Sequence, residues 1–338
     1  MSLPKVMRAI VCPSVPIPPS GLLYTTTHPT PSPKPGYVLI RVKAFGLNRS
    51  ELFTRQGHSP GIVFPRVLGI ECVGEVKDTG GDGPWKVGDV VGAIMGGMGR
   101  AFDGGYAEYT LVPHSSVSPP IQLPENIGWA EFAAIPETFM TAWGALSESI
   151  KLTQNDTLLI RGGTTSVGLA MATLAKTIFS CPRVIATTRS PKKVATLKAA
   201  GVDDIILDSG KISEDVLKIT DGKGVDKCAE LVGATTLADS CASLGPDGTL
   251  SFIGIVGGEW VVKDFYAMTY LYPRKRLTIF SSDTLDFPNA PLQQIVDSIS
   301  TGKMKLGLDN VFKMEEAGKA HAYMESNSAT GKVVCVVD

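Results

Sequence analysis

The chain has 338 residues, 43% of them hydrophobic, and this length indicates about two domains, each able to bury its own core. With 32 Lys and Arg against 33 Asp and Glu, the formal net charge is −1, so neither nucleic acid nor an anionic membrane is favoured as a partner. The longest apolar runs are far shorter than the ~20 residues of a membrane-spanning helix, and residues 1–13 lack the apolar core of a secretory signal.

The first part of the chain is predicted to consist of short strands separated by glycine-rich turns. The predicted strands are residues 5–12, 37–45, 69–76, 89–95 and 106–112. The proline-rich segment between the first two must be a loop or a sheet edge, because proline lacks a backbone N–H. Many short strands at close intervals favour a small, irregular barrel. From Glu125 the spacing becomes helical, with an interruption at Pro136.

The second part of the chain alternates strand and helix, which indicates a doubly wound parallel sheet and therefore an α/β fold. The predicted strands are 157–160, 183–187, 204–207, 225–232, 249–255 and 277–282, and the predicted helices between them include 191–200, 213–220 and 236–244. Helices 292–300 and 315–326 follow. A last strand, 332–337, lies beyond the parallel unit and could return to the first domain.

The stretch that begins at Thr157 carries the strongest functional signal. A short apolar strand runs into a tight glycine turn and then into a helix of small apolar residues. Gly163, Thr165 and Gly168 occupy the three glycine positions of the dinucleotide fingerprint G-x-G-x-x-G, where unpaired N–H groups at a helix N-terminus bind a pyrophosphate. Threonine in the middle position departs from the motif, so an ordinary strand-to-helix turn is the alternative reading.

About twenty residues after this turn, a dinucleotide fold places the residue that contacts the adenosine ribose. That position falls at Thr188, and no Asp or Glu occurs from residue 169 to residue 202. Arg189, Lys192 and Lys193 stand there instead, and cations suit the 2′-phosphate of NADP, which a carboxylate would repel. The two lysines could also form the solvated face of the helix 191–200, and both readings can hold together. We predict NADPH rather than NADH as the cofactor.

The six cysteines are scattered, with no Cys-x-x-Cys pair, at positions 12, 72, 181, 228, 241 and 335. Scattered cysteines on apolar stretches are typically core residues, which predicts a reducing, cytoplasmic setting. The four histidines, His28, His58, His114 and His321, show no metal-ligand spacing and are expected to be surface or hydrogen-bonding residues.

A set of motifs in a fixed order resembles the zinc-independent quinone oxidoreductase branch of the medium-chain dehydrogenase/reductase superfamily over nearly the whole chain. The motifs are AFGLNRSELF at 44–53, FPRVLGIECVGEV at 64–76, KVGDVVGA at 86–93, DGGYAEYTLVP at 103–113, RGGTTSVGLA at 161–170 and LGPDGTLSFIGI at 244–255. The resemblance implies a GroES-like β-barrel domain, residues 1–124 and 307–338, around a Rossmann nucleotide-binding domain, residues 125–306. In this branch a small residue commonly replaces the middle glycine, which fits Thr165.

The resemblance also implies that no metal is bound. Zinc-containing relatives hold a catalytic ion on Cys, His and Cys, and the matching positions here are Asn48, Ile70 and Glu137. An amide, an alkyl group and a single carboxylate do not make a zinc site. The cysteines of the structural zinc lobe are missing from 95–105, a glycine-rich loop whose Met98 and Phe102 could rim an apolar pocket or form a plain surface hairpin.

The resemblance further implies hydride transfer from NADPH to a quinone or an α,β-unsaturated carbonyl, a reaction that needs orientation and an oxyanion donor. Asn48 would donate to the substrate carbonyl, or simply stabilise a turn. Ser50 would take the place of a hydroxyl proton relay, or cap a helix. Thr141 would touch the nicotinamide, and Glu71 is expected to be a structural carboxylate paired with Arg49 or Arg66.

Around the cofactor, the resemblance assigns Ser166 and Val167 to the pyrophosphate, Arg189 and Lys193 to the 2′-phosphate, and Gly233 and Gly254 to the riboses. Asp208 would weaken NADPH binding unless its carboxylate turns away. A homodimer is expected to form through the edge strand 277–282. The other expected partner is a small-molecule substrate. Alternatives are an enoyl reductase for enoyl thioesters of a polyketide or fatty-acyl pathway, and a non-catalytic NADPH-binding sensor or structural protein.

Overall fold

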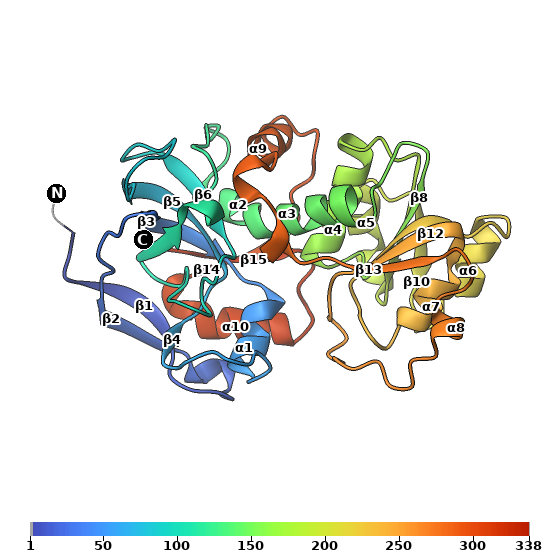
Figure 1. The fold of residues 1–338 in the computed structure, drawn as a ribbon, viewed down its shortest axis with the longest axis horizontal. Helices are drawn as coiled ribbons and strands as arrows, with labels where there is room; N and C mark the ends of the chain where they lie inside the picture. The colour runs from blue at the N-terminus through green and yellow to red at the C-terminus, as the bar shows by residue number, and fades with distance from the viewer. Residues whose placement is uncertain (1–2, 338) are drawn as a thin grey trace. The chain divides into compact units, whose positions relative to one another are not determined.

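The computed structural model describes residues 3–337, which pack into two compact units (Figure 1). Unit 1 consists of the residues up to 140, 283–301 and the residues from 308 onward, and unit 2 consists of 141–282 and 302–307. The predicted division differs at three places, because 125–140 and 283–301 belong to unit 1 and Gly307 belongs to unit 2. The helix α2 (Trp129–Ala133) packs on the strands of unit 1. In α9 (Leu292–Ser300), the Gln293 side chain donates to the Gln122 carbonyl and accepts from the Gln122 N–H, and the Ser300 carbonyl accepts from the Asn126 amide.

Unit 1 contains the short strands that the sequence predicts, arranged in two sheets. A three-stranded sheet has the order β2-β1-β4, and a six-stranded sheet has the order β14-β15-β3-β5-β6, with β7 paired to β3. The bounds are β1 Val6–Cys12, β2 Leu23–Pro29, β3 Tyr37–Gly46, β4 Arg66–Val67, β5 Glu71–Asp78, β6 Val90–Ile94, β7 Tyr109–Pro113, β14 Leu308–Lys313 and β15 Lys332–Val336. The proline-rich segment supplies β2, which lies at a sheet edge.

The last strand returns to unit 1, as the sequence suggested. β15 pairs antiparallel with β3, with Val334 opposite Gly46, and β14 pairs parallel with β15. The sequence reading missed β14 and β4. The helices of unit 1 are α1 (Arg49–Arg55), α2, α9 and α10 (Ala317–Glu325), together with most of α3 (Pro136–Gly144), which begins at the proline that was expected to interrupt it.

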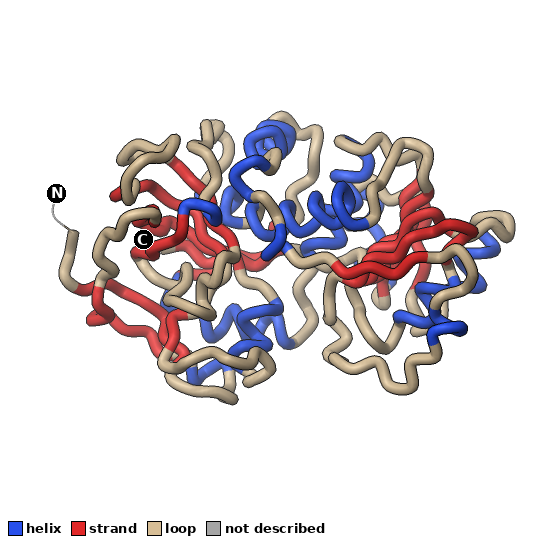
Figure 2. Tube along the Cα trace, viewed as in Figure 1, coloured by secondary structure: helices blue, strands red, loops and turns tan. Residues whose placement is uncertain are grey.

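Unit 2 holds a six-stranded parallel sheet in the order β10-β9-β8-β11-β12-β13 (Figure 2). Its strands are β8 Thr157–Arg161, β9 Arg183–Thr188, β10 Asp204–Leu207, β11 Val225–Glu230, β12 Leu244–Phe252 and β13 Arg276–Ile279, and its helices are α4 Ser166–Thr177, α5 Val194–Ala199, α6 Ser213–Ile219, α7 Leu237–Ala242 and α8 Ala267–Tyr270. The chain winds outward from β8 in both directions, which confirms the doubly wound α/β prediction. Only α8 was not predicted, and α3 continues into unit 2 as a π-helix, Ala145–Ser149.

Each unit has its own buried core. In unit 1 the Phe45 and Tyr106 rings stack with centroids 4.4 Å apart, and in unit 2 Leu159, Ile185 and Leu250 lie fully buried between strands and helices. All six cysteines are buried and carry free thiols, which confirms their prediction as core residues. Among residues 3–337, no helix combines the length and apolarity required to cross a bilayer.

Candidate functional site

The geometry of the turn between β8 and α4 requires the glycines that its sequence carries. Gly162 has a φ of +88°, a conformation that a side chain rarely adopts. A Cβ on Gly163 would lie 2.8 Å from the Cβ of Ala186, and a Cβ on Gly168 would lie 2.7 Å from two backbone carbonyl oxygens of the turn. Strand β9 and helix α4 can therefore approach the turn only because these positions carry no side chain.

Thr165, the departure from the fingerprint, is the N-cap of α4. Its φ of −74° and ψ of 161° need no glycine, its Oγ1 accepts a hydrogen bond from the Gly168 N–H at 3.0 Å, and its hydroxyl donates to the Gly162 carbonyl at 2.9 Å. The side chain thus folds back into the turn. The backbone N–H groups of Ser166 and Val167, at the first two helical positions, have no acceptor within the helix. They lie at the positive end of the helix dipole, where a helix can donate hydrogen bonds to an anion.

The end of β9 is bonded directly to this turn. Gly163 N–H donates to the Thr187 carbonyl at 3.0 Å, and Gly162 N–H donates to Thr187 Oγ1 at the same distance. Thr188 is buried, and its hydroxyl oxygen accepts from the Ser190 N–H at 3.2 Å, which shapes the next turn. Arg189 is exposed in this turn, and Lys193 is partly exposed just before α5. The predicted 2′-phosphate residues Arg189 and Lys193 therefore follow closely in the chain after Thr187, which is bonded to the β8–α4 turn.

Asp208 follows β10 beside the end of β9, and its carboxylate is paired with a buried arginine. Its two carboxylate oxygens accept from Nε and Nη2 of Arg161, both at 3.0 Å, and the guanidinium is fully buried at the end of β8. Arg161 Nη1 also donates to Asp239 Oδ2 at 2.7 Å and to Ser240 Oγ at 3.1 Å. Burial alone would raise the pKa of Asp208, but hydrogen bonds from Arg161 and Gly210 outweigh it and lower the pKa. The negative charge of Asp208 is thus offset by a buried guanidinium, and its effect on NADPH binding stays a prediction.

A second carboxylate organises the neighbouring strand end. Glu230 closes β11, is fully buried, and accepts hydrogen bonds from the N–H groups of Val232 at 2.7 Å and Gly233 at 3.0 Å. Burial raises its pKa. Gly233 has a φ of +114°, and a Cβ on Gly254 would lie 2.9 Å from the Leu231 carbonyl oxygen. Both predicted ribose positions therefore need glycine for backbone reasons.

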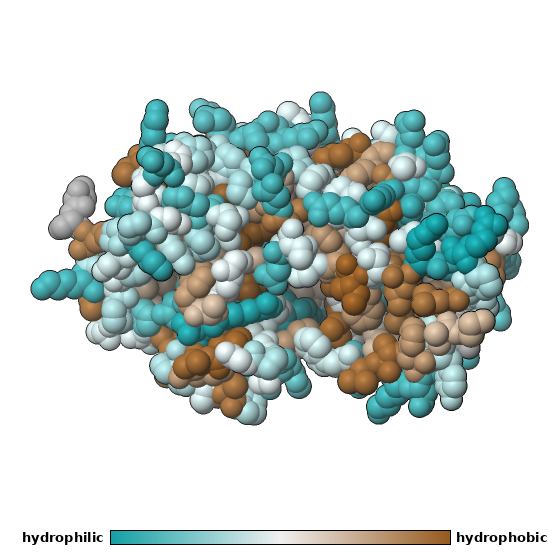
Figure 3. Space-filling model, in the orientation of Figure 1, coloured by the Kyte–Doolittle hydropathy of each residue, from teal (hydrophilic) through white to brown (hydrophobic). Residues whose placement is uncertain are grey.

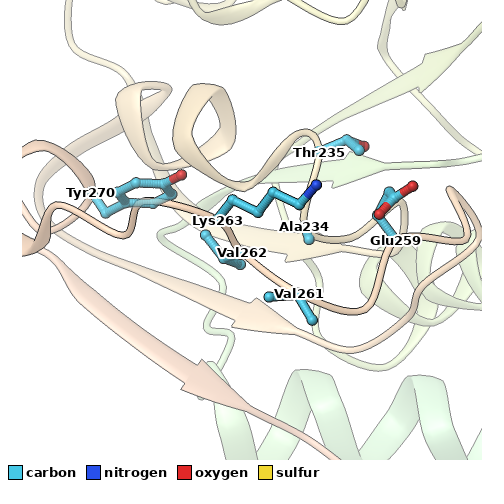
Figure 4. Close-up of a pocket in the computed structure, with 7 residues that line it drawn as sticks. All are labelled: Ala234, Thr235, Glu259, Val261, Val262, Lys263 and Tyr270. Atoms are coloured by element: carbon cyan, nitrogen blue, oxygen red, sulfur yellow. The ribbon is translucent and has the colours of Figure 1, made fainter.

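A cavity of about 350 Å³ lies beside this strand end (Figure 4). It is lined by residues of the β11 turn and of the segment after β12, and its size is within the range of small-molecule sites. In Figure 4 the Lys263 ammonium group points toward Thr235, and Tyr270 lies at the other end of the lining. The sequence did not single out any of these three residues.

In unit 1, Asn48 is part of a buried ionic cluster. It is the N-cap of α1, so its backbone N–H donates to Glu51 Oε2 at 3.0 Å, while its side-chain amide donates to Glu71 Oε1 at 2.9 Å. Lys332, the first residue of β15, contacts both Asn48 and Glu71: its Nζ lies 2.6 Å from Asn48 Oδ1 and 2.5 Å from Glu71 Oε1. The predicted pairing of Glu71 with Arg49 or Arg66 is wrong, because its cation is the buried Lys332.

Glu51 completes this cluster. The Ile70 N–H donates to its Oε1 at 3.0 Å, and its side chain is fully buried. Burial, the largest cause, raises the pKa of Glu51 from 4.5 to about 7, against the lowering effect of the two backbone hydrogen bonds and of Lys332. Glu71 in turn accepts from the Glu137 N–H at 3.0 Å, which joins α3 to the cluster.

The other two predicted catalytic residues lie in different units. Ser50 follows the N-cap and is not itself the cap; its Oγ accepts from Arg100 Nη2 at 2.6 Å, which leaves its proton for another acceptor. Thr141 lies in α3 at the start of unit 2, half-buried. The structure places Asn48 and Ser50 together at the start of α1, and the catalytic roles of all three stay predictions.

The positions that correspond to zinc ligands do not fit a zinc ion. The Asn48 oxygen faces an ammonium group, Ile70 offers only an alkyl side chain, and Glu137 is a single carboxylate. Within residues 3–337, no three or more His, Cys, Asp and Glu side chains gather as a metal site. His321, for example, is buried beside Arg55 and Tyr106, and burial lowers its pKa to about 3.

Sequence reasoning missed Arg161, Lys332 and Glu51 as members of these clusters. A signal was present for two of them, since Arg161 ends an otherwise apolar strand and Lys332 begins one. A charge on an apolar strand indicates a buried partner, because an unpaired buried charge is strongly destabilising. The partners could not be named, since they come from distant parts of the chain.

Two protein-family models match the chain. Residues 34–125 match the alcohol dehydrogenase GroES-like domain, and residues 200–335 match the zinc-binding dehydrogenase domain. The first match falls on the strands of unit 1, and the second begins in unit 2 and ends on β15.

Named relatives cover almost the whole chain. This chain is 26% identical over 321 residues to a quinone oxidoreductase of Pseudomonas aeruginosa, a match that covers 94% of this chain and 95% of the relative. It is 28% identical over 317 residues to a phenolphthiocerol/phthiocerol polyketide synthase protein of Mycobacterium tuberculosis, covering 89% of this chain and 14% of that much longer protein. A mycobacterial structure in complex with NADPH superposes with a TM-score of 0.84 at 27% identity, covering 98% of this chain and 99% of the other.

Proposed function

The chain belongs to the medium-chain dehydrogenase/reductase superfamily, and from this premise we propose that it is an NADPH-dependent, metal-free oxidoreductase that transfers hydride to a quinone or an α,β-unsaturated carbonyl. Nicotinamide-dependent oxidoreduction is the common activity of this superfamily. The observation that supports the choice of NADPH is the pairing of both Asp208 carboxylate oxygens with Arg161, which offsets the negative charge near the cationic turn at Arg189.

The cofactor fits the residues present in unit 2. The α4 amides of Ser166 and Val167 would bind the pyrophosphate, and Arg189 with Lys193 would bind the 2′-phosphate. Gly233 and Gly254 would lie near the riboses, and both positions need glycine because a side chain there would meet the backbone or strain it. When bound, the nicotinamide supplies a hydride to an electron-poor carbon.

Residues of the α1 start would orient the substrate. Ser50, with its oxygen already accepting from Arg100, has a proton to donate to a developing oxyanion. Asn48 would present its amide only by sharing it with Glu71, so its role is to hold Glu71 and Lys332 as much as to touch substrate. Thr141 would contact the nicotinamide.

The cofactor proposal is tested by binding. Replacing Arg189 and Lys193 together by alanine should weaken NADPH binding by about 10- to 100-fold and leave NADH binding nearly unchanged, since only NADPH carries the 2′-phosphate. Lys198→Ala, an exposed lysine on the same helix segment, is the control and should change neither affinity. Equal losses for both cofactors in titrations of tryptophan fluorescence would refute the phosphate assignment.

The reaction is tested by turnover. Loss of NADPH absorbance with quinones and enones would support the proposal, whereas turnover confined to crotonyl thioesters would favour an enoyl reductase. The second reading has specific support, because the chain matches a segment of a polyketide synthase protein over 89% of its own length. NADPH binding without turnover of any acceptor would indicate a sensor or structural protein.

We further propose that the protein works in a cytoplasmic setting, where its thiols stay free. We also propose that two copies form a homodimer through the β13 edge. β13 ends its sheet, and Figure 3 shows apolar side chains gathered over β13 and α8. Ile279, Tyr266 and Met268 are 75%, 70% and 82% exposed, a surface that a second copy could cover. Sedimentation equilibrium should give twice the chain mass for the wild type and less for Ile279→Lys; a monomeric wild type would contradict the proposal.

A further inference from the structure

Unit 1 contains a cavity of about 560 Å³ that no part of the proposed function uses. It lies between the end of β2, the segment 30–37, β7 and the glycine-rich loop 95–105. Its volume is within the range of sites for small organic ligands. All of its lining residues belong to unit 1.

The sequence left open whether the glycine-rich loop 95–105 rims a pocket or forms a plain surface hairpin, and the structure shows that it rims a pocket. Met98 is fully buried in the core, whereas Phe102 and Asp103 line the cavity. Tyr109 of β7 and the proline Pro31 also contribute to the lining, so one part of the wall is aromatic and apolar. A planar apolar group can pack against such a wall.

The charged part of the wall is cationic. Arg66 Nη1 and the Val67 N–H both donate to Asp103 Oδ1, at 2.9 and 3.0 Å, and His28 Nε2 lies 3.0 Å from Asp103 Oδ2. Both oxygens of the lining carboxylate are therefore engaged. Lys34, held 4.2 Å from the centroid of the Tyr37 ring, adds a second cation, so the lining has one more cation than anion when His28 is neutral.

Two buried donors of the lining lack a partner. Among the residues that the structure describes, the Thr30 hydroxyl and the Arg66 Nε–H make no hydrogen bond, although each atom is buried. Buried donors are rarely left unsatisfied, because they have lost their hydrogen bonds to water. Both atoms lie beneath the surface of the lining, so an oxyanion in the cavity would complement the excess positive charge and would gain these two donors when the Thr30 and Arg66 side chains turn toward it.

We propose that this cavity is a binding site for a small organic anion, with a carboxylate or phosphate group bound by Arg66, Thr30 and Lys34 and a planar apolar body packed on Phe102 and Tyr109. The site is independent of the nicotinamide cofactor, and no bond is made or broken in it.

Isothermal titration of the full chain with 1-naphthoate, phenyl phosphate, inorganic phosphate and the neutral 2-naphthol tests this proposal. The two organic anions should bind with one site per chain, and the better of them identifies the oxyanion. Inorganic phosphate and 2-naphthol should each bind at least about tenfold more weakly, since each lacks one half of the recognised group. Equal affinity for 2-naphthol, or displacement of naphthoate by NADPH at one equivalent, would overturn the proposal.

Variants locate the site. Thr30→Val and Lys34→Met should each weaken anion binding by about tenfold, and Arg66→Lys by more, because a lysine cannot present two parallel N–H donors. Lys86→Met, an exposed lysine on a different loop, is the control and should bind as the wild type does. Should Arg66→Lys fail to fold, Thr30→Val and Lys34→Met decide, and wild-type affinity in both would overturn the proposal.

Discussion

Each unit of this protein buries a cation between carboxylates, and the two clusters differ in how completely the charges are paired. In unit 2, Arg161 donates to Asp208 and Asp239 through a planar fork and also to Ser240. In unit 1, Lys332 is a point charge that contacts Glu71 and Asn48 and only influences Glu51 from a distance. The arginine cluster is thus a fixed support, whereas the lysine cluster contains a carboxyl group with a pKa of about 7.

The difference follows from the geometry of the two cations. A guanidinium joins carboxylates that come from different elements, here β10's end and α7, and so fixes the strand ends that carry the proposed cofactor site. An ammonium group has fewer donors, and the second carboxylate of unit 1 is left to backbone N–H groups. Four substitutions, from the largest expected effect to the smallest, test this contrast.

Arg161→Met should be the most damaging change. It leaves Asp208, Asp239 and Glu230 without their buried cation, and removing one partner of a buried pair costs about 3–5 kcal/mol. The free energy of unfolding, measured by urea denaturation, should fall by this amount. Arg183→Ala, which breaks a half-exposed pair with Asp204, is the control and should cost less than about 1 kcal/mol. Similar losses for the two variants would remove the distinction between fixed and surface pairs.

Lys332→Met should cost about 3 kcal/mol, somewhat less than Arg161→Met, because fewer carboxylates lose their partner. Adding Glu71→Gln to this variant should recover part of the loss, since the unpaired buried charge is then removed. Lys319→Met, at an exposed pair with Glu316, is the matched control in the same unit and should be nearly neutral. Additive losses in the double variant would mean that Lys332 and Glu71 do not act as a pair.

Glu51→Gln should change how stability depends on pH. The pKa of Glu51 is higher in the folded protein than its usual 4.5, so its contribution to stability is fully present below that value and is lost as pH rises through about 7. Between about pH 5 and pH 8 the wild type should therefore lose on the order of 2–3 kcal/mol relative to Glu51→Gln. Unfolding curves measured across this range check the slope, and parallel curves would contradict it.

The opposite slope is expected from the two aspartates that pair with Arg161 in unit 2. The pKa values of Asp208 and Asp239 are lowered, so the stability from their pairing is present above their usual pKa and is lost as pH falls below it. In the wild type, acid below about pH 4 should therefore destabilise unit 2 while it no longer affects Glu51.

Thr165→Ala should have the smallest effect. It removes the N-cap of α4, which costs about 1 kcal/mol, whereas Thr165→Gly should cost only a few tenths. Thermal unfolding and NADPH titration of both variants check this. A loss of several kcal/mol for Thr165→Ala would show that the hydroxyl supports more of the turn than the cap alone.

The sequence predicted the elements of both units well where a local pattern was strong. β8, the glycine turn and α4 followed from an apolar run, glycines and a helix of small residues, and the α9 bounds matched the predicted 292–300. β4 and β14 were missed because two residues, or a strand of mostly exposed residues, carry little periodicity. The division into units was displaced because helical spacing shows that a segment is a helix and not which unit the helix packs on, as for α2 and α9.

The candidate site divides in the same way. Gly162, Thr165 and Gly168 act mainly through their own backbone and their neighbours in the chain, so the sequence alone determined the conformation of the β8–α4 turn. The partner of Asp208 and the partner of Glu71 lie 47 and 261 positions away, and only the tertiary structure decided that Arg161 and Lys332 would face them. Local backbone preferences are encoded within a few residues, whereas pairing of buried charges depends on which strand ends the fold brings together.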